Sequence, residues 1–404
     1  MNHLPGDRSV TPALVRGRLL FVFPWRNPGG AVKSLLHLIR HLSGHYDCVL
    51  AGPVEGADRE IIDKGRTICP FIAFDTREFD DEAGIHLQFS RFFMGCWKTM
   101  VLLLRTRPDV VVFFLHHPLA AAAPRFALAL LRRRAIVSFR LVMNGLPVGP
   151  RRIRMLNWEK KRGQTWVAVS EDNRQRLCGD MGLDSGEIQL IYNGIGPLAG
   201  PGRAQGEARR ELRRRLGLPE DRTIFLFSGR LELRKGCREL ALAAAALWKE
   251  HPEALCVMLG DGPERDRLEE SIRNSGAEPG VLLAGHRSNG AEYLAAADVF
   301  VHPSYYEGLS NSMLEAMQMG LPVVAANCSS MPELVTDQVE GLLVPRGDSE
   351  ALCRAMAKLL GDESLRGRLG QAAEIRARAF PLDATLSAWD KLIEEVMGSR
   401  GSGR

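Results

Sequence analysis

Short apolar runs alternate with segments of helical period along almost the whole chain. In the first half the apolar runs are LLFVF, YDCVLAG, FIAFD, DVVVFFL, AIVSFRLVM, WVAVS and IQLIYNG, and helical patterns lie between most of them, at 30–43, 86–106, 118–133 and 171–181. The pattern restarts at residue 223 with TIFLFSG, ALCVML, VLLAG, VFVHPS, PVVAAN and GLLVP. Strands that are apolar throughout are buried on both faces, so both series predict parallel sheets covered by helices.

The two series predict an α/β protein with two doubly wound, Rossmann-like domains. A chain of 404 residues is also too long for one ordinary core. The Gly- and Pro-rich start of 196–222 suits a linker. We therefore expect a first domain over 1–199, a second over 200–380, a C-terminal helix over 381–398 that packs back on the first domain, and a disordered tail at 399–404.

Composition places the protein among soluble globular chains, with 45% hydrophobic and 25% charged residues. The longest apolar stretches are interrupted by His, Pro or Arg before they reach membrane-spanning length, and the start lacks the order of a signal peptide. The eight cysteines are scattered without a CxxC pair. These features predict a cytoplasmic protein with reduced thiols and no zinc framework.

Positive charge is concentrated in the first half of the chain. Residues 1–200 contain 27 Lys and Arg against 18 Asp and Glu, whereas residues 201–404 contain 26 against 30. A basic half that faces anionic lipid or a phosphorylated acceptor is one interpretation, and a solvated Arg-rich surface is the other. No aromatic-interleaved basic stretch accompanies the charge, so a nucleic-acid partner is not expected.

Glycine-rich turns follow four of the predicted strands, at the edge where parallel sheets bind ligands. One of them, GRLELRKG, carries Arg230 and Lys235 five positions apart. A guanidinium grips phosphate in bidentate fashion and an ammonium acts as a point charge, so together they can neutralise a diphosphate without a metal. The plainer interpretation is a solvated turn with incidental charge.

The stretch EGLSNSMLE, which begins at Glu307, follows the run VFVHPS and has an acid at each end. The plainer interpretation is a loop entering a helix that is capped at Ser312 and Glu315 and stopped at Gly320. The functional interpretation places Glu307 against a sugar, the N–H groups of Gly308 to Asn311 against phosphate, and Glu315 against ribose. Both interpretations can hold together, because a cap does not preclude a ligand for Glu315.

The second half resembles the nucleotide-binding domain of GT-B glycosyltransferases, specifically the large retaining family 4. The motifs that carry the resemblance are FSGRLELRKG, MLGDGPERDRLE, GLLVPRGD and the stretch 296–335, whose two glutamates are separated by seven residues. In the first half, NPGGAVKSLLHLIRHL and the segments WVAVSEDNRQRL and IYNGI resemble the glycine turn and late segments of that family more loosely. The resemblance implies a GT-B architecture, with two Rossmann-like domains facing across a cleft.

The resemblance also implies a donor site for a nucleotide-diphosphate sugar. Arg230 and Lys235 would stabilise the leaving diphosphate, and Glu307 would contact the transferred sugar. The remaining contacts that it implies are the first-domain turn at Gly29 and Gly30, the base-side loop at His286 and Arg287, the amides of Gly308, Leu309, Ser310 and Asn311, and the ribose ligand Glu315.

Two positions depart from the family pattern, both on the acceptor side. A histidine near the reacting sugar is frequent in the family, and the matching residue here is Asn144, which can hydrogen-bond a hydroxyl but cannot carry a proton. The acid that often follows the glycine pair is here Val32. His116 and His117, after DVVVFFL, are alternative histidines for the cleft, with a packing role as the competing interpretation.

By resemblance, the reaction is a metal-independent hexosyl transfer with retention, in which the acceptor hydroxyl attacks on the face that the phosphate leaves. No cofactor is expected beyond the nucleotide-sugar co-substrate. The expected acceptor is a lipid-linked or cell-envelope glycan, reached by peripheral contact with the inner face of an anionic membrane.

Three other functions compete with this hypothesis. A GT-B-like sugar-nucleotide epimerase would need acid and base residues in the cleft, and Asn144 in place of histidine argues against it. A dinucleotide oxidoreductase is disfavoured because no strand runs into GxGxxG with an acid about 20 residues later. A non-catalytic sugar-nucleotide-binding protein is disfavoured by the intact set of Arg230, Lys235, Glu307 and Glu315.

Overall fold

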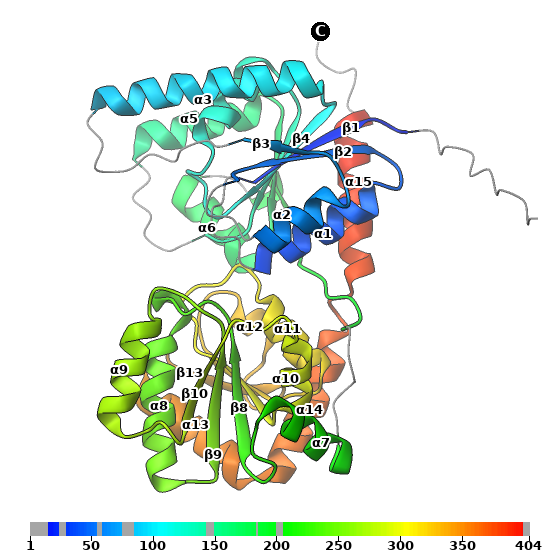
Figure 1. The fold of residues 1–404 in the computed structure, drawn as a ribbon. Coiled ribbons are helices and arrows are strands. Elements are labelled where there is room, and N and C mark those ends of the chain that lie inside the picture. Colours follow the sequence, from blue (N-terminus) through cyan, green and yellow to red (C-terminus); the bar gives the residue numbers. More distant parts are fainter. Residues whose placement is uncertain are drawn as a thin grey trace, which may run out of the picture.

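The computed structural model describes residues 15–23, 30–54, 59–74, 85–142, 149–182, 185–198 and 205–398. These residues form two parallel sheets, one of seven strands and one of six, each covered by helices (Figure 1). The tail expected at 399–404 lies outside the described residues.

The first sheet has the strand order β3-β2-β1-β4-β5-β6-β7. Its strands are β1 (Arg18–Val22), β2 (Asp47–Gly52), β3 (Phe71–Ala73), β4 (Val110–Leu115), β5 (Ala135–Phe139), β6 (Gln164–Ala168) and β7 (Ile188–Leu190). The helices of this domain are α1 (Gly30–Leu42), α2 (Arg59–Arg66), α3 (Ile85–Thr106), α4 (Ala122–Leu130), α5 (Pro150–Lys161) and α6 (Glu171–Met181), with a short 3₁₀ turn η1 (Ser185–Glu187). The order reverses between β1 and β4, which makes their carboxyl ends the expected ligand edge.

The second sheet has the order β10-β9-β8-β11-β12-β13, with the same reversal between β8 and β11. Its strands are β8 (Thr223–Ser228), β9 (Ala254–Leu259), β10 (Val281–Gly285), β11 (Val299–His302), β12 (Val323–Ala326) and β13 (Gly341–Val344). Its helices are α7 (Gly206–Leu216), η2 (Leu233–Lys235), α8 (Cys237–Glu250), α9 (Arg265–Ser275), α10 (Gly290–Ala296), α11 (Asn311–Gln318), α12 (Met331–Leu334), α13 (Ser349–Gly361) and α14 (Glu363–Ala377).

The predicted fold class is confirmed, since every apolar run contains a parallel strand of one of the two sheets. Two predicted elements are longer than the observed ones. The run AIVSFRLVM forms a strand only as far as Phe139, because the charged Arg140 follows. The helix expected over 118–133 is confined to Ala122–Leu130; it begins after Ala121, which has a left-handed backbone with φ of 52°.

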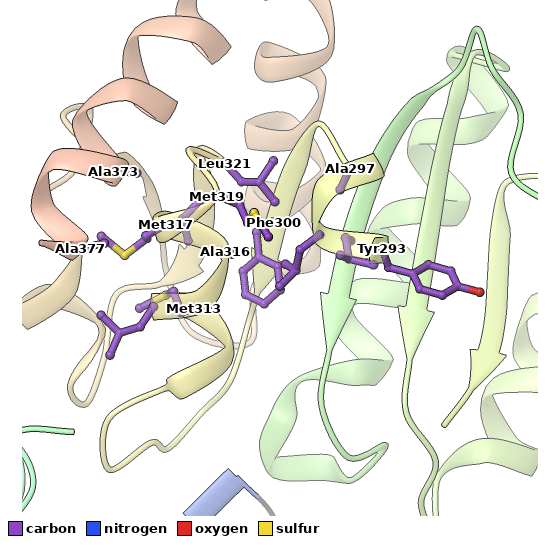
Figure 2. Close-up of a cluster of buried hydrophobic side chains, with 14 of the residues drawn as sticks. Tyr293, Ala297, Phe300, Met313, Ala316, Met317, Met319, Leu321, Ala373 and Ala377 are labelled. Atoms are coloured by element: carbon purple, nitrogen blue, oxygen red, sulfur yellow. The ribbon is translucent and has the colours of Figure 1, made fainter. Parts of the chain in front are cut away.

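Helix α11 is fixed by a dense apolar core on one face of the second sheet. Met313, Ala316 and Met317 of α11 pack with Phe300 of β11, and Ala373 of α14 belongs to the same cluster (Figure 2). All five side chains are completely buried. Burial of this face holds the start of α11, and the loop before it, in one position.

The last helix, α15 (Leu382–Gly398), follows the second domain in sequence but packs on the first (Figure 1). The ring of Trp389 stacks on Phe114 of β4, with 5.6 Å between centroids and 17° between planes. The carboxylate of Asp390 lies 2.7 Å from His41 of α1. The chain therefore passes twice between the domains, and the second passage is tied to the first by Ile195, whose N–H donates to the Phe380 carbonyl at 3.0 Å.

We expect Trp389→Ala to lower the free energy of unfolding of the first domain by about 3–5 kcal/mol, because it removes a buried aromatic ring that the sheet cannot replace. Urea unfolding followed by circular dichroism measures the change. The matched control is Leu242→Ala on α8, where the side chain is 54% exposed and the expected change is within about 0.5 kcal/mol. Equal effects of the two substitutions would contradict a structural role for α15.

Candidate active site between the two domains

The carboxyl ends of the two sheets meet, and several contacts join them. Gly308 of the second domain lies so close to the first that a Cβ there would come 1.8 Å from the carbonyl oxygen of Arg140. The carboxylate of Glu333 accepts hydrogen bonds from the N–H groups of Glu171 and Asp172 at the start of α6, both at 2.8 Å. A glycine at position 308 is required by this close approach.

Glu307 lies at the centre of this junction, five residues beyond the end of β11, and is only 7% exposed. Its backbone is held by the residues that follow β12, since its carbonyl accepts from the hydroxyls of Ser329 at 2.7 Å and Ser330 at 3.3 Å. Its side chain forms an ion pair with Lys235, the last residue of η2. The two strands that flank β11 therefore both contribute to fixing one carboxylate.

The charge state of Glu307 follows from its neighbours. Burial alone would raise its pKa, but the charge of Lys235, a hydrogen bond with His302 and the charge of Arg234 together hold the pKa well below its usual range. Glu307 is therefore ionised near neutral pH. An ionised carboxylate in this position is a hydrogen-bond acceptor, which suits sugar hydroxyls.

His302, the last residue of β11, forms a hydrogen bond with the side chain of Glu307. It is completely buried between Phe227 and Phe300, with ring centroids 6.5 and 5.9 Å away. Its Nε2 lies 3.0 Å from Oε1 of Glu307, and its Nδ1 has no hydrogen-bond partner among the described residues. Burial lowers the pKa of His302 in spite of the acid, so the neutral ring donates its Nε2 proton to Glu307.

Two further cations stand beside Lys235 on the turn after β8. Arg234 donates to Glu232 at 2.6 Å and approaches Glu307 to 3.9 Å. Arg230 lies 3.9 Å from Glu232, with 38% of its side chain exposed. Arg230, Arg234, Lys235, His302 and Glu307 are called the interdomain site below; it combines three cations with one acid that is buried and ionised.

The residues from Gly308 to Asn311 form the entry into α11, but the capping prediction was wrong in one respect. The helix begins at Asn311, and its N-cap is Ser310, whose side chain accepts from Met313 N; Ser312 already lies inside the helix. Leu309 and Ser310 are buried. The predicted stop is confirmed, because Gly320 has a left-handed backbone with φ of 67° just beyond the last turn.

Glu315 is not engaged in a cap and instead faces the first domain. Its carboxylate lies 3.7 Å from the ammonium of Lys33 on α1. One turn earlier in α11, Asn311 donates to the hydroxyl of Ser34 at 3.0 Å. Helix α1 starts at Gly30, so the structure brings this first-domain turn toward α11, whereas Gly29 lies outside the described residues.

Arg287 is not brought to the interdomain site. It is exposed, like His286, on the loop after β10. In the sheet, β9 and β8 separate β10 from β11. A base-side role for this loop remains a prediction.

On the first-domain side, Arg140 directly follows β5, and the predicted site residue Asn144 lies outside the described residues. The Arg140 guanidinium stacks over Phe114 at 5.1 Å and donates to Asn193 at 2.5 Å. Burial lowers the pKa of Arg140 to about 9. Asn193 continues the network into the second domain by donating to the carbonyl of Leu309 at 3.2 Å.

Of the two histidines after β4, His116 is the one near the site cations. Burial and the charges of Arg234, Arg140 and Arg230 lower its pKa to about 3, so its ring is neutral. His117 instead accepts from the N–H of Leu119 at 3.2 Å, which is a local turn contact. Three site residues were missed from sequence: Arg234, Arg140 and His302. Only the position of His302 at a strand end marked it in advance.

Two family models match the chain. One, described as Glycosyl transferases group 1, matches residues 208–376, and the other, described as Glycosyltransferase Family 4, matches residues 28–197. The chain belongs to the group 1, family 4 glycosyltransferases. Together the two matches include every strand of the two sheets except β1, and they include the interdomain site, Lys33 and Asn193.

Curated members of the family are similar over part of their length. The lipopolysaccharide core biosynthesis glycosyltransferase LpsE of Rhizobium meliloti (strain 1021) is 35% identical over 208 residues, which are 51% of this chain and 58% of that protein. A D-inositol 3-phosphate glycosyltransferase of Salinispora arenicola (strain CNS-205) is 35% identical over 264 residues, 59% of this chain and 58% of that protein. The chain thus spans little more than half the length of these relatives.

Solved structures agree on the fold. Anabaena Alr3699/HepE, in its complex with UDP-glucose, superposes with a TM-score of 0.76 at 20% identity and covers 94% of this chain and 100% of its own. A glycosyltransferase from Rickettsia africae ESF-5 gives a TM-score of 0.77 at 17% identity, covering 95% and 99%. These similarities establish the GT-B fold.

We expect Lys235→Met to lower the free energy of unfolding by about 3–5 kcal/mol, because it leaves the buried carboxylate of Glu307 without its main counter-charge. Glu307→Gln placed in the same chain should recover part of the loss, since a neutral amide needs no counter-ion and can still accept from His302. Chemical denaturation of the single and double variants measures both changes. The control is Lys249→Met on the exposed side of α8, and a double variant less stable than Lys235→Met would contradict the pairing.

The same ion pair predicts a pH dependence. The folded pKa of Glu307 lies below the unfolded value of about 4.3, so the carboxylate stabilises the folded state above that pH and the contribution is lost as the pH falls through the folded pKa. The difference in unfolding free energy between the natural chain and Glu307→Gln should be constant from about pH 7 to about pH 5 and should shrink below about pH 4. Urea unfolding over this pH series tests it; a difference that grows toward acid would refute the assignment.

Proposed function

We propose that the protein transfers a hexosyl group, with retention, from a nucleotide-diphosphate sugar to a hydroxyl of a lipid-linked or cell-envelope glycan, without a metal. The observation that carries the proposal is the pairing of Arg234 and Lys235 with the ionised Glu307 just before α11, with Arg230 beside Glu232 on the same turn. The cations suit the diphosphate of such a donor, and the carboxylate, which accepts hydrogen bonds from hydroxyls, suits its sugar. Family membership, the UDP-glucose complex of the Anabaena protein and the lipopolysaccharide core assignment of LpsE support it further.

In the proposed reaction the bond between the sugar C1 and the diphosphate oxygen breaks, and its electron pair goes to the diphosphate. Arg230 and Lys235 stabilise the charge that develops there, together with the N–H groups at the start of α11. The acceptor oxygen bonds to C1 on the face that the phosphate leaves, and its proton passes to the diphosphate. Glu307 orients the sugar through its hydroxyls.

Lys235 has a double role in this proposal. Without donor it neutralises Glu307, and with donor its ammonium can also face a phosphate oxygen, since it carries three donors. Glu307 then keeps its hydrogen bond with His302 while it accepts from the sugar. The ion pair thus keeps Glu307 ionised and Lys235 beside it before a ligand with both hydroxyl and phosphate groups binds.

The proposal extends to location. The acceptor class implies a cytoplasmic enzyme in peripheral contact with an anionic membrane, because a lipid-linked glycan is presented at the membrane surface. No helix in the described part of the chain is long and apolar enough to cross a bilayer.

The test is a panel of UDP-, GDP-, ADP- and dTDP-sugars, assayed for binding, hydrolysis and transfer to glycan acceptors. We expect one donor class to bind and to be turned over, and Lys235→Met or Glu307→Gln to reduce turnover about 100-fold or more, the typical effect of removing one charge-stabilising group. Lys249→Met, on the outside of α8, is the matched control and should leave turnover unchanged.

The competing functions give different results in the same panel. An epimerase would convert one sugar nucleotide into another without releasing nucleotide, and a binding protein would retain a donor without turnover on any acceptor. Binding of NAD but of no sugar nucleotide would indicate an oxidoreductase. Undiminished turnover in both Lys235→Met and Glu307→Gln would remove the site assignment even if the protein proved to be a glycosyltransferase.

A further inference from the structure

Helix α3 presents large apolar side chains to solvent along most of its length. Phe93 is 67% exposed, Trp97 65% and Leu104 70%, and Met94 beside them is 55% exposed. Their spacing of three, four and seven residues places them on one side of the helix, where the half-buried Val101 joins them. These five residues are called the α3 outer face. Three aromatic or aliphatic side chains this exposed on one helix face are unusual for a surface without a partner.

The orientation of α3 is fixed by its opposite side. A Cβ on Gly95 would come within 2.8 Å of the Cβ of Ala123, so α3 and α4 approach closely there. Thr99 is 2% exposed, and Leu102 and Leu103 are buried in the first-domain core. The helix cannot rotate to hide the α3 outer face without breaking this packing.

A row of cations borders the α3 outer face. Arg91, Lys98 and Arg105 follow one another at intervals of seven residues, which is about two helical turns, so they form a line along one edge of the apolar stripe. Helix α4 runs beside α3 and ends in the exposed Leu130 and Leu131, which the basic run 132–134 follows. The chain at the end of α4 therefore also carries exposed apolar residues followed by cations.

Acids are few within α3 and the elements that follow it, although five acids precede α3 in residues 75–84. Residues 85–162 contain fifteen Lys and Arg against two Asp and Glu, a net charge of +13. Of the two acids, Glu159 is completely buried beside Arg125 at 3.5 Å, and Asp109 accepts from the backbone of Arg18. The segment that contains α3 and α4 is therefore strongly basic in sequence, and three of its cations border the α3 outer face.

We propose that the α3 outer face and its row of cations dock the protein on an anionic lipid bilayer, with α3 lying in the plane of the interface. Aromatic rings favour the depth of the lipid headgroups, and flanking Lys and Arg side chains reach back to lipid phosphates. Helices that combine an apolar face with a basic border bind anionic membranes in this manner. A second copy of the same face is a poorer occupant, because it would oppose one row of cations to another.

The position of α3 in the fold suits this role. Figure 1 shows α3 along the outer side of the first domain, on the far side from the second domain. Docking there leaves the second domain free to move against the first. The surface deepens the proposed membrane contact but does not depend on glycosyl transfer, so lipid binding and sugar-nucleotide turnover can each fail alone.

Flotation with lipid vesicles tests the proposal on the full chain. We expect binding to vesicles of phosphatidylcholine mixed with phosphatidylglycerol, and much weaker binding to phosphatidylcholine alone. Arg91→Gln, Lys98→Gln and Arg105→Gln together should weaken binding on the order of 100-fold, at roughly fivefold per cation. Replacing Phe93, Met94 and Trp97 by Ser should weaken it at least as much, while circular dichroism and unfolding show that both variants remain folded.

Matched controls come from the second domain. Leu242→Ser and Ile375→Ser remove apolar side chains of similar exposure, 54% and 59%, and Arg354→Gln removes an exposed cation. These three variants should bind vesicles as the natural chain does. In addition, lipids brominated on their acyl chains should quench the fluorescence of the natural chain, and Trp97→Phe should abolish most of the quenching.

Two results would overturn the proposal. If the natural chain does not bind anionic vesicles, or if the α3 variants bind as well as the controls, the surface is not a lipid-docking site. If sedimentation instead shows a dimer that dissociates when Phe93 and Trp97 are replaced, and vesicles do not bind, the face is an interface between two copies. A loss of donor turnover with intact vesicle binding would refute the proposed function and leave this inference standing.

Discussion

A carboxylate that is both buried and ionised is the constraint on which the centre of this molecule depends. Leaving Glu307 without compensation would cost several kcal/mol, so its counter-charges must come from other elements. Lys235 arrives from the turn after β8 and His302 donates its Nε2 proton from the end of β11, while the Ser329 hydroxyl beyond β12 donates to the backbone carbonyl of Glu307. The charge compensation therefore requires that the adjacent parallel strands β8 and β11 end together, and β12 beside them supplies the residue that fixes the Glu307 backbone.

The loop that carries Glu307 is held from the first domain as well. Gly308 lies against the carbonyl of Arg140, and Asn193 binds the carbonyl of Leu309 and the side chain of Asn311. The same Asn193 accepts from the guanidinium of Arg140. A relative movement of the domains therefore changes the support of the loop itself, which couples domain closure to the position of the acid.

Most of the fold could be predicted from the sequence. Strands buried on both faces have unbroken apolar runs, whereas the helices between them have apolar residues at helical spacing. The pattern failed where burial did not require an apolar residue. Strand β5 ends at Phe139, four residues before the apolar run ends, and the Arg140 that follows is buried by stacking on Phe114, which no periodicity reveals. Helix α5 was not predicted because its outward side is strongly basic and only Leu156 and Glu159 are buried.

The site was predicted unequally, for a related reason. Arg230, Lys235 and Glu307 stand at strand ends in motifs that a sequence displays directly. The role of Arg234 depends on the direction in which its side chain leaves η2. The role of Asn193 depends on its contact with Asn311 of the other domain, which lies 118 positions later in the sequence. Such pairings are set by tertiary structure, so a single sequence does not contain their signal. The N-cap was misplaced by two residues because Ser310 and Ser312 both precede the apolar positions of α11.

The basic residues of the two domains differ in the acids that lie near them. Arg125 is neutralised inside the core by Glu159, and the site cations are accompanied by Glu232 and Glu307. Cations that already have a fixed acid nearby exert little attraction on a diffuse anionic surface, but they can exchange partners with a ligand that brings both phosphate and hydroxyl groups. The cations of the α3 row are spaced along a helix, and such a row suits an extended anionic surface better than one small ligand. The spatial arrangement of the cations, more than their number, thus distinguishes the proposed donor site from the proposed membrane surface.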